Sequence, residues 1–317
     1  KGGNDSLSSG DGNDTIIVSS AGQGNGDTVD GGNGTDTLQL SSGSHSFSND
    51  ALLQNIQTIT LNASGTNVNL TGQTEGLTIS GGAGTDIITA GSGNDIITGA
   101  GGADTITGAG GSDTISLGSS DSASDIIIFN SSSGMDIIKQ FTAGSSNGDI
   151  MKYIGNLSDQ ESSANTTTGS DSTDDLLSVD FAINAQNGSV NNNKLVLGFS
   201  TAVTQNGLSS GTSIDFTGAG ISSSQIISAI ETSLENSNAG SGSGLLSGTG
   251  TGVFHGDGNE SKILLFTDGG SGSSEDVAMV LYTEGGTSDM DFSGELTLAN
   301  ILESTSLTTL THDNFWG

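Results

Sequence analysis

Aliphatic residues recur at every ninth position through much of the first half of the chain. One row of them runs Leu52, Leu61, Leu70, Ile79, Ile88, Ile97, Ile106 and Ile115, and a second row of Ile59, Val68 and Leu77 runs beside it. In the most regular part, each is the middle residue of a three-residue stretch whose central side chain would point inward from a short strand. The pattern predicts short parallel strands stacked in a solenoid, with one apolar residue of each strand in the core.

The residues between these strands define a nine-residue repeat. Residues 81–116 read GGAGTDIIT, AGSGNDIIT, GAGGADTIT and GAGGSDTIS, so an aspartate precedes every strand. Two earlier stretches, GGNDSLSSGDGNDTI and GNGDTVDGGNGTDTL, have the same spacing. The six residues GGxGxD make a turn whose backbone conformations glycine adopts most easily. Two such units are expected to close one flattened coil of 18 residues.

Stacking the coils would bring carboxylates together. Asp86 would lie beside Asp104 on one edge, and Asp95 beside Asp113 on the other, about 4.8 Å apart. Carboxylates this close repel each other unless a cation lies between them, and carboxylate and turn-carbonyl oxygens select Ca²⁺. The candidate calcium ligands are the aspartates before the strands and the glycines of the turns: Asp5, Asp14, Asp27, Asp36, Gly84, Asp86, Gly93, Asp95, Gly102, Asp104, Gly111, Asp113, Asp125 and Asp136.

The repeat G-G-x-G-x-D-x-U-x, with U a large aliphatic residue, resembles that of the RTX (repeats-in-toxin) calcium-binding family over residues 1–116. Beyond the repeat, MDIIKQFTAGSSNGDIMKY is similar to the segment that follows the β-roll in serralysin-type proteins, and the strands from ILLF to HDNF resemble the family's terminal β-domain. The resemblance implies a right-handed parallel β-roll that binds several Ca²⁺ ions. It also implies export by a type I secretion machinery.

The expected fold is all-β, a calcium-binding parallel β-roll (β-solenoid) followed by a C-terminal β-rich domain. Residues 1–150 would form the roll. Its segment at about 40–80 lacks aspartate at the ligand phase and is expected to continue the solenoid without calcium, the alternative being a separate β-hairpin unit. After Ser116 the spacing is irregular, so Asp125 and Asp136 belong either to degenerate terminal repeats or to ordinary solvated acids.

Residues 151–317 would form the C-terminal domain, associated with secretion. Longer stretches of alternating residues predict strands there and in the segment leading to it: IIKQF, DIMKYI, KLVLGF, SIDF, KILLF, VAMVLY and ELTL. One helix is predicted at SSSQIISAIETSLEN, where Ser222 can cap the first turn together with Gln225. Ile226, Ile230 and Leu234 would line one face of that helix.

The strongly negative charge of the chain limits the partners that it can bind. The chain has 36 acidic residues against 5 lysines, a formal net charge of −31 and no cysteine. Such a chain stays unfolded unless its charge is neutralised, and it lacks the basic footprint needed to bind nucleic acid. No apolar run approaches the roughly 18 residues of a membrane span. The chain begins inside a repeat with no N-terminal signal peptide visible, which suggests the C-terminal part of a longer, secreted polypeptide.

No catalytic constellation is apparent, so an enzyme is not expected. His45, His255 and His312 are far apart in polar, loop-like stretches, and HExxH does not occur. The serine motif GLSSG at 207–211 has no helical pattern after it. The sequence favours a secreted structural protein at the bacterial cell surface, similar to RTX surface-layer proteins, that folds outside the cell with calcium. The alternatives are the carrier module of an RTX exoenzyme or toxin and a segment of an adhesin.

Self-association would be the main interaction of a surface-layer protein. Two copies that each carry a net charge of −31 would repel each other, so contact is expected to use calcium between acidic clusters. Candidate clusters are Asp171, Asp174 and Asp175, and also Asp289 and Asp291.

Overall fold

A computed structural model describes residues 4–19, 26–118, 123–144, 147–154, 196–199, 203, 214–238, 261–268, 275–283, 296–310 and 314–315. The chain forms two compact units, one of Lys1–Ile154 with Asp313–Gly317 and one of Gly155–His312.

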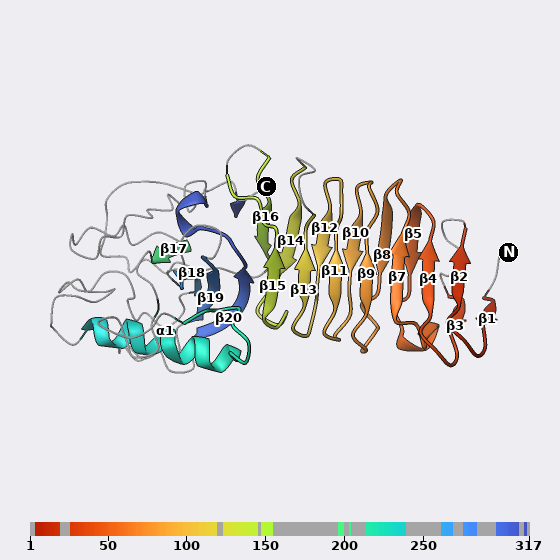
Figure 1. Ribbon diagram of the computed structural model, residues 1–317, viewed down its shortest axis with the longest axis horizontal. Coiled ribbons are helices and arrows are strands. Elements are labelled where there is room, and N and C mark those ends of the chain that lie inside the picture. Colours follow the sequence, from red (N-terminus) through yellow and green to blue (C-terminus); the bar gives the residue numbers. More distant parts are fainter. Residues whose placement is uncertain are drawn as a thin grey trace, which may run out of the picture. The chain divides into compact units, whose positions relative to one another are not determined.

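The first unit is a parallel β-solenoid of about six turns (Figure 1). One sheet runs in the order β2 (Thr15–Val18), β4 (Thr37–Leu40), β7 (Thr58–Leu61), β9 (Thr78–Ser80), β11 (Ile96–Thr98), β13 (Thr114–Ser116) and β15 (Asp136–Lys139). The second runs β5 (Gly43–Ser46), β8 (Thr66–Asn69), β10 (Ile87–Thr89), β12 (Thr105–Thr107), β14 (Ile126–Phe129) and β16 (Ile150–Tyr153). A third sheet consists of β1 (Ser6–Ser8), β3 (Thr28–Asp30) and β6 (Leu53–Gln54). The all-β fold expected from the repeat is confirmed.

The core is a set of aliphatic rows, one for each sheet. In the first sheet Ile97 lies between Ile79 and Ile115, and all three side chains are buried. In the second sheet Ile106 stacks on Ile88 in the same way. Full burial of such a side chain contributes roughly 1.5–3 kcal/mol, so the rows are the main apolar support of the roll.

On the N-terminal side of Ile79, the inward-facing aliphatic residues no longer follow the nine-residue spacing. That spacing was expected to continue through Leu70, Leu61 and Leu52. The residue opposite Ile79 is Ile59, twenty positions earlier, and Leu52 lies in a short 3₁₀ helix, η1 (Asp50–Leu52). Extra residues in the turns lengthen these coils, so the inward position moves to the second row seen in the sequence.

The strands of the aspartate-poor segment belong to the same sheets as the rest of the roll. β7 pairs in parallel with β4 and β9, and β8 pairs in parallel with β5 and β10. They pair with these neighbours and not with each other as a hairpin would.

The second unit contains a sheet in the order β17 (Val196–Phe199), β18 (Ser261–Thr267), β19 (Val277–Thr283) and β20 (Leu296–Leu302), with helix α1 (Ser223–Asn238) against β20 and a short helix η3 (Leu307–Thr309). The predicted helix cap is present, because the backbone N–H of Ser222 donates to Oε1 of Gln225 (2.9 Å) and that of Gln225 donates to Oγ of Ser222 (3.3 Å). Ile226 and Ile230 are buried as expected.

The strand predicted at SIDF is wrong. Ile214 and Phe216 lie in a non-strand segment although both are buried. Apolar and polar residues alternate in this segment, as they do in a strand, and buried and exposed positions alternate with them. Among the described residues, no helix is both long and apolar enough to cross a membrane.

Candidate metal centre

The aspartates before the strands form ladders that run along the stack of coils. The backbone N–H of Asp86 donates to Oδ1 of Asp104, and that of Asp95 to Oδ1 of Asp113, both at 2.8 Å. The same bond joins Asp5 to Asp27 and Asp14 to Asp36 at 2.7 Å, Asp104 to Asp125 at 2.8 Å, and Asp113 to Asp136 at 3.0 Å. Each carboxylate thus ties its own coil to the preceding one.

The second oxygen of these carboxylates lies against a turn glycine. Oδ2 of Asp86 accepts from the N–H of Gly82 at 2.9 Å. A Cβ placed on Gly108 would lie 2.2 Å from Oδ2 of Asp113, and one on Gly31 would lie 2.7 Å from Oδ2 of Asp36. The first glycine of the turn therefore leaves the space that the carboxylate occupies.

The glycine at the fourth position of the turn is needed for a different reason. Gly102 and Gly111 have φ values of 107° and 109°, in the region that favours glycine. A Cβ on Gly102 would lie 2.7 Å from the carbonyl oxygen of Gly84, and one on Gly111 would lie 2.2 Å from that of Gly93. The four predicted glycines thus stack in two pairs, with the carbonyl of one coil against the backbone of the next.

Burial leaves part of this carboxylate charge without a protein partner. Asp86, Asp95, Asp104 and Asp113 are each at most 1% exposed. The Oδ2 atoms of Asp14, Asp36 and Asp113 are buried and accept no hydrogen bond. An ionised carboxylate in this state is costly, and a hard cation that prefers oxygen ligands fits it.

Burial also raises the pKa values of the ladder. Desolvation raises the pKa of Asp95 to about 6, of Asp113 to about 7 and of Asp136 to about 8, each against backbone hydrogen bonds that lower it. Repulsion from Asp95 adds to the rise in the pKa values of Asp113 and Asp136. Desolvation raises the pKa of Asp86 as well. Near neutral pH, a proton or a metal ion must therefore offset the charge of the packed ladder.

Asp125 and Asp136, the two aspartates that follow the regular repeats, are buried and not ordinary solvated acids. Asp125 and Asp136 are both 2% exposed, and they take the ladder positions of the next coils. The sequence analysis missed Asp149, which extends the ladder once more, because the backbone N–H of Asp125 donates to its Oδ1 at 2.9 Å. Its signal was an aspartate before the alternating stretch IMKY, but the spacing of 24 residues lies outside the nine-residue pattern.

Neutral residues hold the ladder positions of the aspartate-poor coils. The N–H of Asp36 donates to Oε1 of Gln57 at 2.8 Å, so an amide oxygen takes the place of a carboxylate. Thr66 and Leu77 donate their backbone N–H groups to Asp86 (2.6 Å) and Asp95 (2.7 Å) and bring no charge of their own. The backbone part of the ladder thus reaches into these coils without the acids.

His45 is not in a loop, as the sequence suggested. It lies on β5 opposite Val68, 1% exposed, with Nε2 at 2.9 Å from the carbonyl oxygen of Ser41. It therefore occupies an inward position of the core. The other two histidines, the GLSSG motif and the acidic clusters at 171–175 and 289–291 lie outside the described residues.

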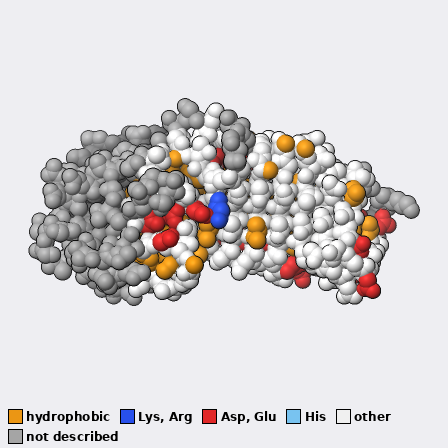
Figure 2. All heavy atoms as spheres, viewed as in Figure 1, with side chains coloured by type: hydrophobic (Ala, Val, Ile, Leu, Met, Phe, Trp, Pro, Cys, Tyr) orange, Lys and Arg blue, Asp and Glu red, His pale blue; other side chains and the backbone are white. Residues whose placement is uncertain are grey.

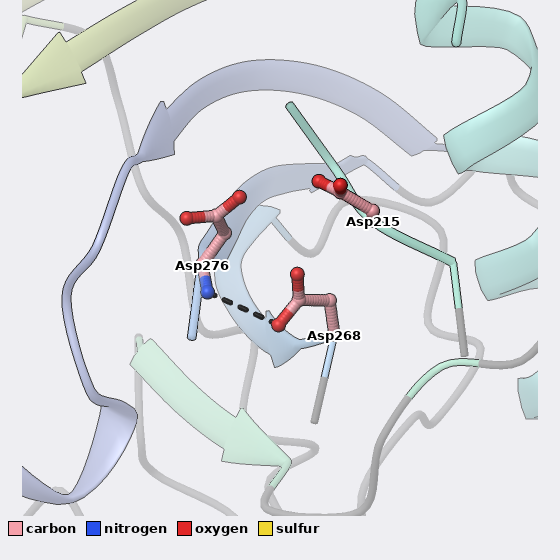
Figure 3. Close-up of side chains that lie close together, drawn as sticks. All are labelled: Asp215, Asp268 and Asp276. Atoms are coloured by element: carbon pink, nitrogen blue, oxygen red, sulfur yellow. Dashed lines mark hydrogen bonds between the residues drawn. The ribbon is translucent and has the colours of Figure 1, made fainter. Parts of the chain in front are cut away.

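A separate acidic group lies in the second unit (Figure 3). Asp215, Asp268 and Asp276 each bring one carboxylate oxygen to within 4.8 Å of the others. The N–H of Ser304 donates to Oδ1 of Asp276 at 2.8 Å, and Oγ1 of Thr217 contacts its Oδ2 at 2.7 Å. No observation beyond the proximity of the three carboxylates points to an ion, so we assign no metal to this group.

Comparison with known families agrees with the ladder geometry. Residues 1–20, 21–44 and 80–115 match the RTX calcium-binding nonapeptide repeat, in four copies. No curated protein and no solved structure matches the chain. The first unit therefore carries RTX repeats, which bind Ca²⁺, and these repeats point to a secreted calcium-binding protein of RTX type. The gap in the match, residues 45–79, covers Gln57, Thr66 and Leu77.

Proposed function

We propose that this chain is a secreted structural protein whose roll folds outside the cell when Ca²⁺ neutralises its aspartate ladders. The buried Oδ2 atoms without a hydrogen-bond donor are the observation that carries the proposal. The coordinating groups would be the predicted aspartates and turn glycines, with Asp149 added at the end of one ladder. The coils at about 40–80 would take no calcium, since Gln57, Thr66 and Leu77 stand at their ladder positions.

Mass action makes this gating strong. At a calcium concentration about ten times the Kd, each site adds about 1.4 kcal/mol to the free energy of unfolding. Roughly six to eight sites with affinities of extracellular modules would add on the order of 10 kcal/mol, comparable to the whole stability of a domain. In the cytosol, where free calcium is far below such a Kd, the acidic chain would stay unfolded and suited to type I secretion.

Far-UV circular dichroism, first in EGTA and then with calcium restored, tests the gating. We expect the β signal to be lost in EGTA and regained in millimolar Ca²⁺ but not in Mg²⁺ at equal ionic strength. A β signal that is unchanged in EGTA would rule out the mechanism.

We further propose that the folded chain associates with copies of itself at the cell surface. The seven strands from β7 to β13 read TITL, TNVN, TIS, IIT, IIT, TIT and TIS and contain no acidic residue. Ile96 in the first sheet and Ile87 in the second are 55% and 44% exposed. The face of the solenoid seen in Figure 2 is largely uncharged. Such a face would allow two chains of net charge −31 to approach with little repulsion.

Light scattering against calcium concentration, with magnesium as the control, tests the assembly. Growth of particles with calcium after the roll has folded supports a surface-layer role. A folded protein that stays monomeric in millimolar calcium would favour the alternative, a C-terminal carrier module of an RTX exoenzyme, toxin or adhesin.

A further inference from the structure

The last coil of the roll ends in a loop that Asp149 holds closed. Oδ2 of Asp149 accepts from the backbone N–H of Thr142 at 2.6 Å, and the N–H of Asp149 donates to the carbonyl oxygen of Thr142 at 2.8 Å. Its Oδ1 accepts from the N–H of Asp125. The carboxylate that ends this ladder therefore also ties Asp149 to Thr142 at the two ends of this segment.

The C-terminal residues of the chain dock on this loop. Oδ1 of Asn314 accepts from the N–H of Gly144 at 3.1 Å, and its Nδ2 donates to the carbonyl oxygen of Asp149 at 2.8 Å. Asn314 is fully buried and Phe315 is 6% exposed. A Cβ on Gly148 would lie 2.8 Å from Nδ2 of Asn314, so a glycine at this position leaves room for the amide.

Both the oxygen and the nitrogen of the Asn314 side-chain amide have a backbone hydrogen-bond partner, although these partners lie 170 and 165 residues earlier in the chain. An aspartate at position 314 could not donate to the carbonyl of Asp149, and an alanine could make neither bond. Asn314 and Phe315 belong to the compact first unit.

From these contacts we infer that residues 142–144 and 147–149 are a docking site for Asn314 and Phe315, and that calcium controls the docking. The two backbone groups that bind Asn314 are placed by a loop whose shape depends on the Asp149 carboxylate. That carboxylate is packed only when the last coils are folded, and this step rests on the proposed calcium-gated folding. Calcium would then bury Asn314 and Phe315 as it folds the roll.

Digestion of the full chain by carboxypeptidase Y, a metal-independent enzyme, followed by mass spectrometry tests the docking. Circular dichroism of the same samples reports the folding of the roll separately. The variants are Asn314→Ala and a matched control, Asn67→Ala, which removes an exposed amide from β8. In calcium we expect the C-terminus of the unmodified chain and of Asn67→Ala to be released at least about tenfold more slowly than in EGTA. In Asn314→Ala, release in calcium should be about tenfold faster than in the unmodified chain. A change of this order is expected when the net contribution of two hydrogen bonds to stability is lost.

The two readouts separate the docking from the folding. If calcium folds the roll but the C-terminus is digested equally fast with and without calcium, the docking inference is overturned and the proposed function stands. Equal protection of Asn314→Ala and Asn67→Ala would also overturn the inference. If the circular dichroism does not respond to calcium, both proposals fail.

Discussion

The coils at 81–149 and those at 41–80 belong to the same solenoid but differ in their charge. Both contribute parallel strands to the same two sheets and aliphatic residues to the same core rows, Ile97 and Ile88 in one part and Ile59 and Val68 in the other. The aspartate-bearing coils pack buried carboxylates in the turns. The other coils have Gln57, Thr66 and Leu77 at these positions.

The difference in charge between the two sets of coils shows that the features that build the solenoid are distinct from those that make its folding depend on calcium. Backbone ladders and apolar rows are common to both parts, so a coil of this fold does not require aspartate. Aspartate adds a hydrogen-bond acceptor and a buried negative charge. The acceptor can be replaced by the amide of Gln57, whereas the charge requires a counter-ion.

Placing a carboxylate in the neutral coils should give the largest effect. Thr66 is 3% exposed and precedes Asp86 in the stack. In Thr66→Asp the added buried charge should destabilise the calcium-free protein by about 3 kcal/mol, the lower end for an uncompensated buried charge. Urea unfolding in EGTA measures this loss, and calcium should recover part of it. Thr66→Asn is the control, and equal losses in both variants would show that shape, not charge, separates the two regions.

Removing a charge from the ladder should have the opposite effect. Asp113→Asn keeps an acceptor for the N–H of Asp95 and removes the negative charge next to an oxygen that has no donor. Without calcium the variant should be more stable than the unmodified chain by roughly 1–3 kcal/mol. In calcium titrations followed by circular dichroism its folding midpoint should move to higher calcium.

The exposed Asp50, on η1, provides the control for this substitution. Asp50→Asn should leave both the stability in EGTA and the calcium midpoint nearly unchanged. A lower stability of Asp113→Asn in EGTA would contradict the idea that the ladder charge opposes folding.

The pH dependence should differ in sign with and without calcium. The raised pKa values of Asp95, Asp113 and Asp136 mean that the folded, calcium-free roll keeps protons that the unfolded chain loses near pH 4. The stability of the calcium-free roll should therefore be highest at about pH 4 and fall as the pH rises towards 8. Since calcium needs the ionised carboxylates, its affinity should fall as the pH is lowered through the same range.

Urea midpoints between pH 4 and pH 8, in EGTA and in saturating calcium, measure both trends. The two curves should converge at low pH, where protons replace calcium. A calcium-free roll that becomes more stable from pH 5 to pH 8 would show that the buried carboxylates are not what limits it.

The regular part of this fold could be predicted because its period is short and strict. The nine-residue spacing of Asp86 to Asp113 and of their aliphatic partners predicted the parallel roll, the aspartate stack and calcium binding. The cap of α1 was predictable as well, since Ser222 and Gln225 interact within one turn. In these cases the interacting residues are close in sequence or repeat in phase.

The rest depends on insertions and on distant contacts. A coil of 20 residues between Ile59 and Ile79 shifts the phase of the aliphatic row, and one of 24 residues hides Asp149 from the repeat. Asn314 finds Gly144 across 170 residues without any periodic signal. His45 reads as a loop residue because its neighbours are serines, although the sheet places it inward.

The smallest effect concerns the turns that distinguish the aspartate-bearing coils. Ala109 takes the second position of its GGxGxD turn with a φ of 70°, where a side chain is unfavourable. Ala109→Gly should therefore stabilise the calcium-bound protein by about 0.5 kcal/mol, because relief of strain exceeds the added entropy of the unfolded chain. Ala103 is exposed, with no positive φ, so Ala103→Gly should lose about as much. Urea midpoints in saturating calcium measure both, and losses in both variants would mean that the left-handed alanine is not strained.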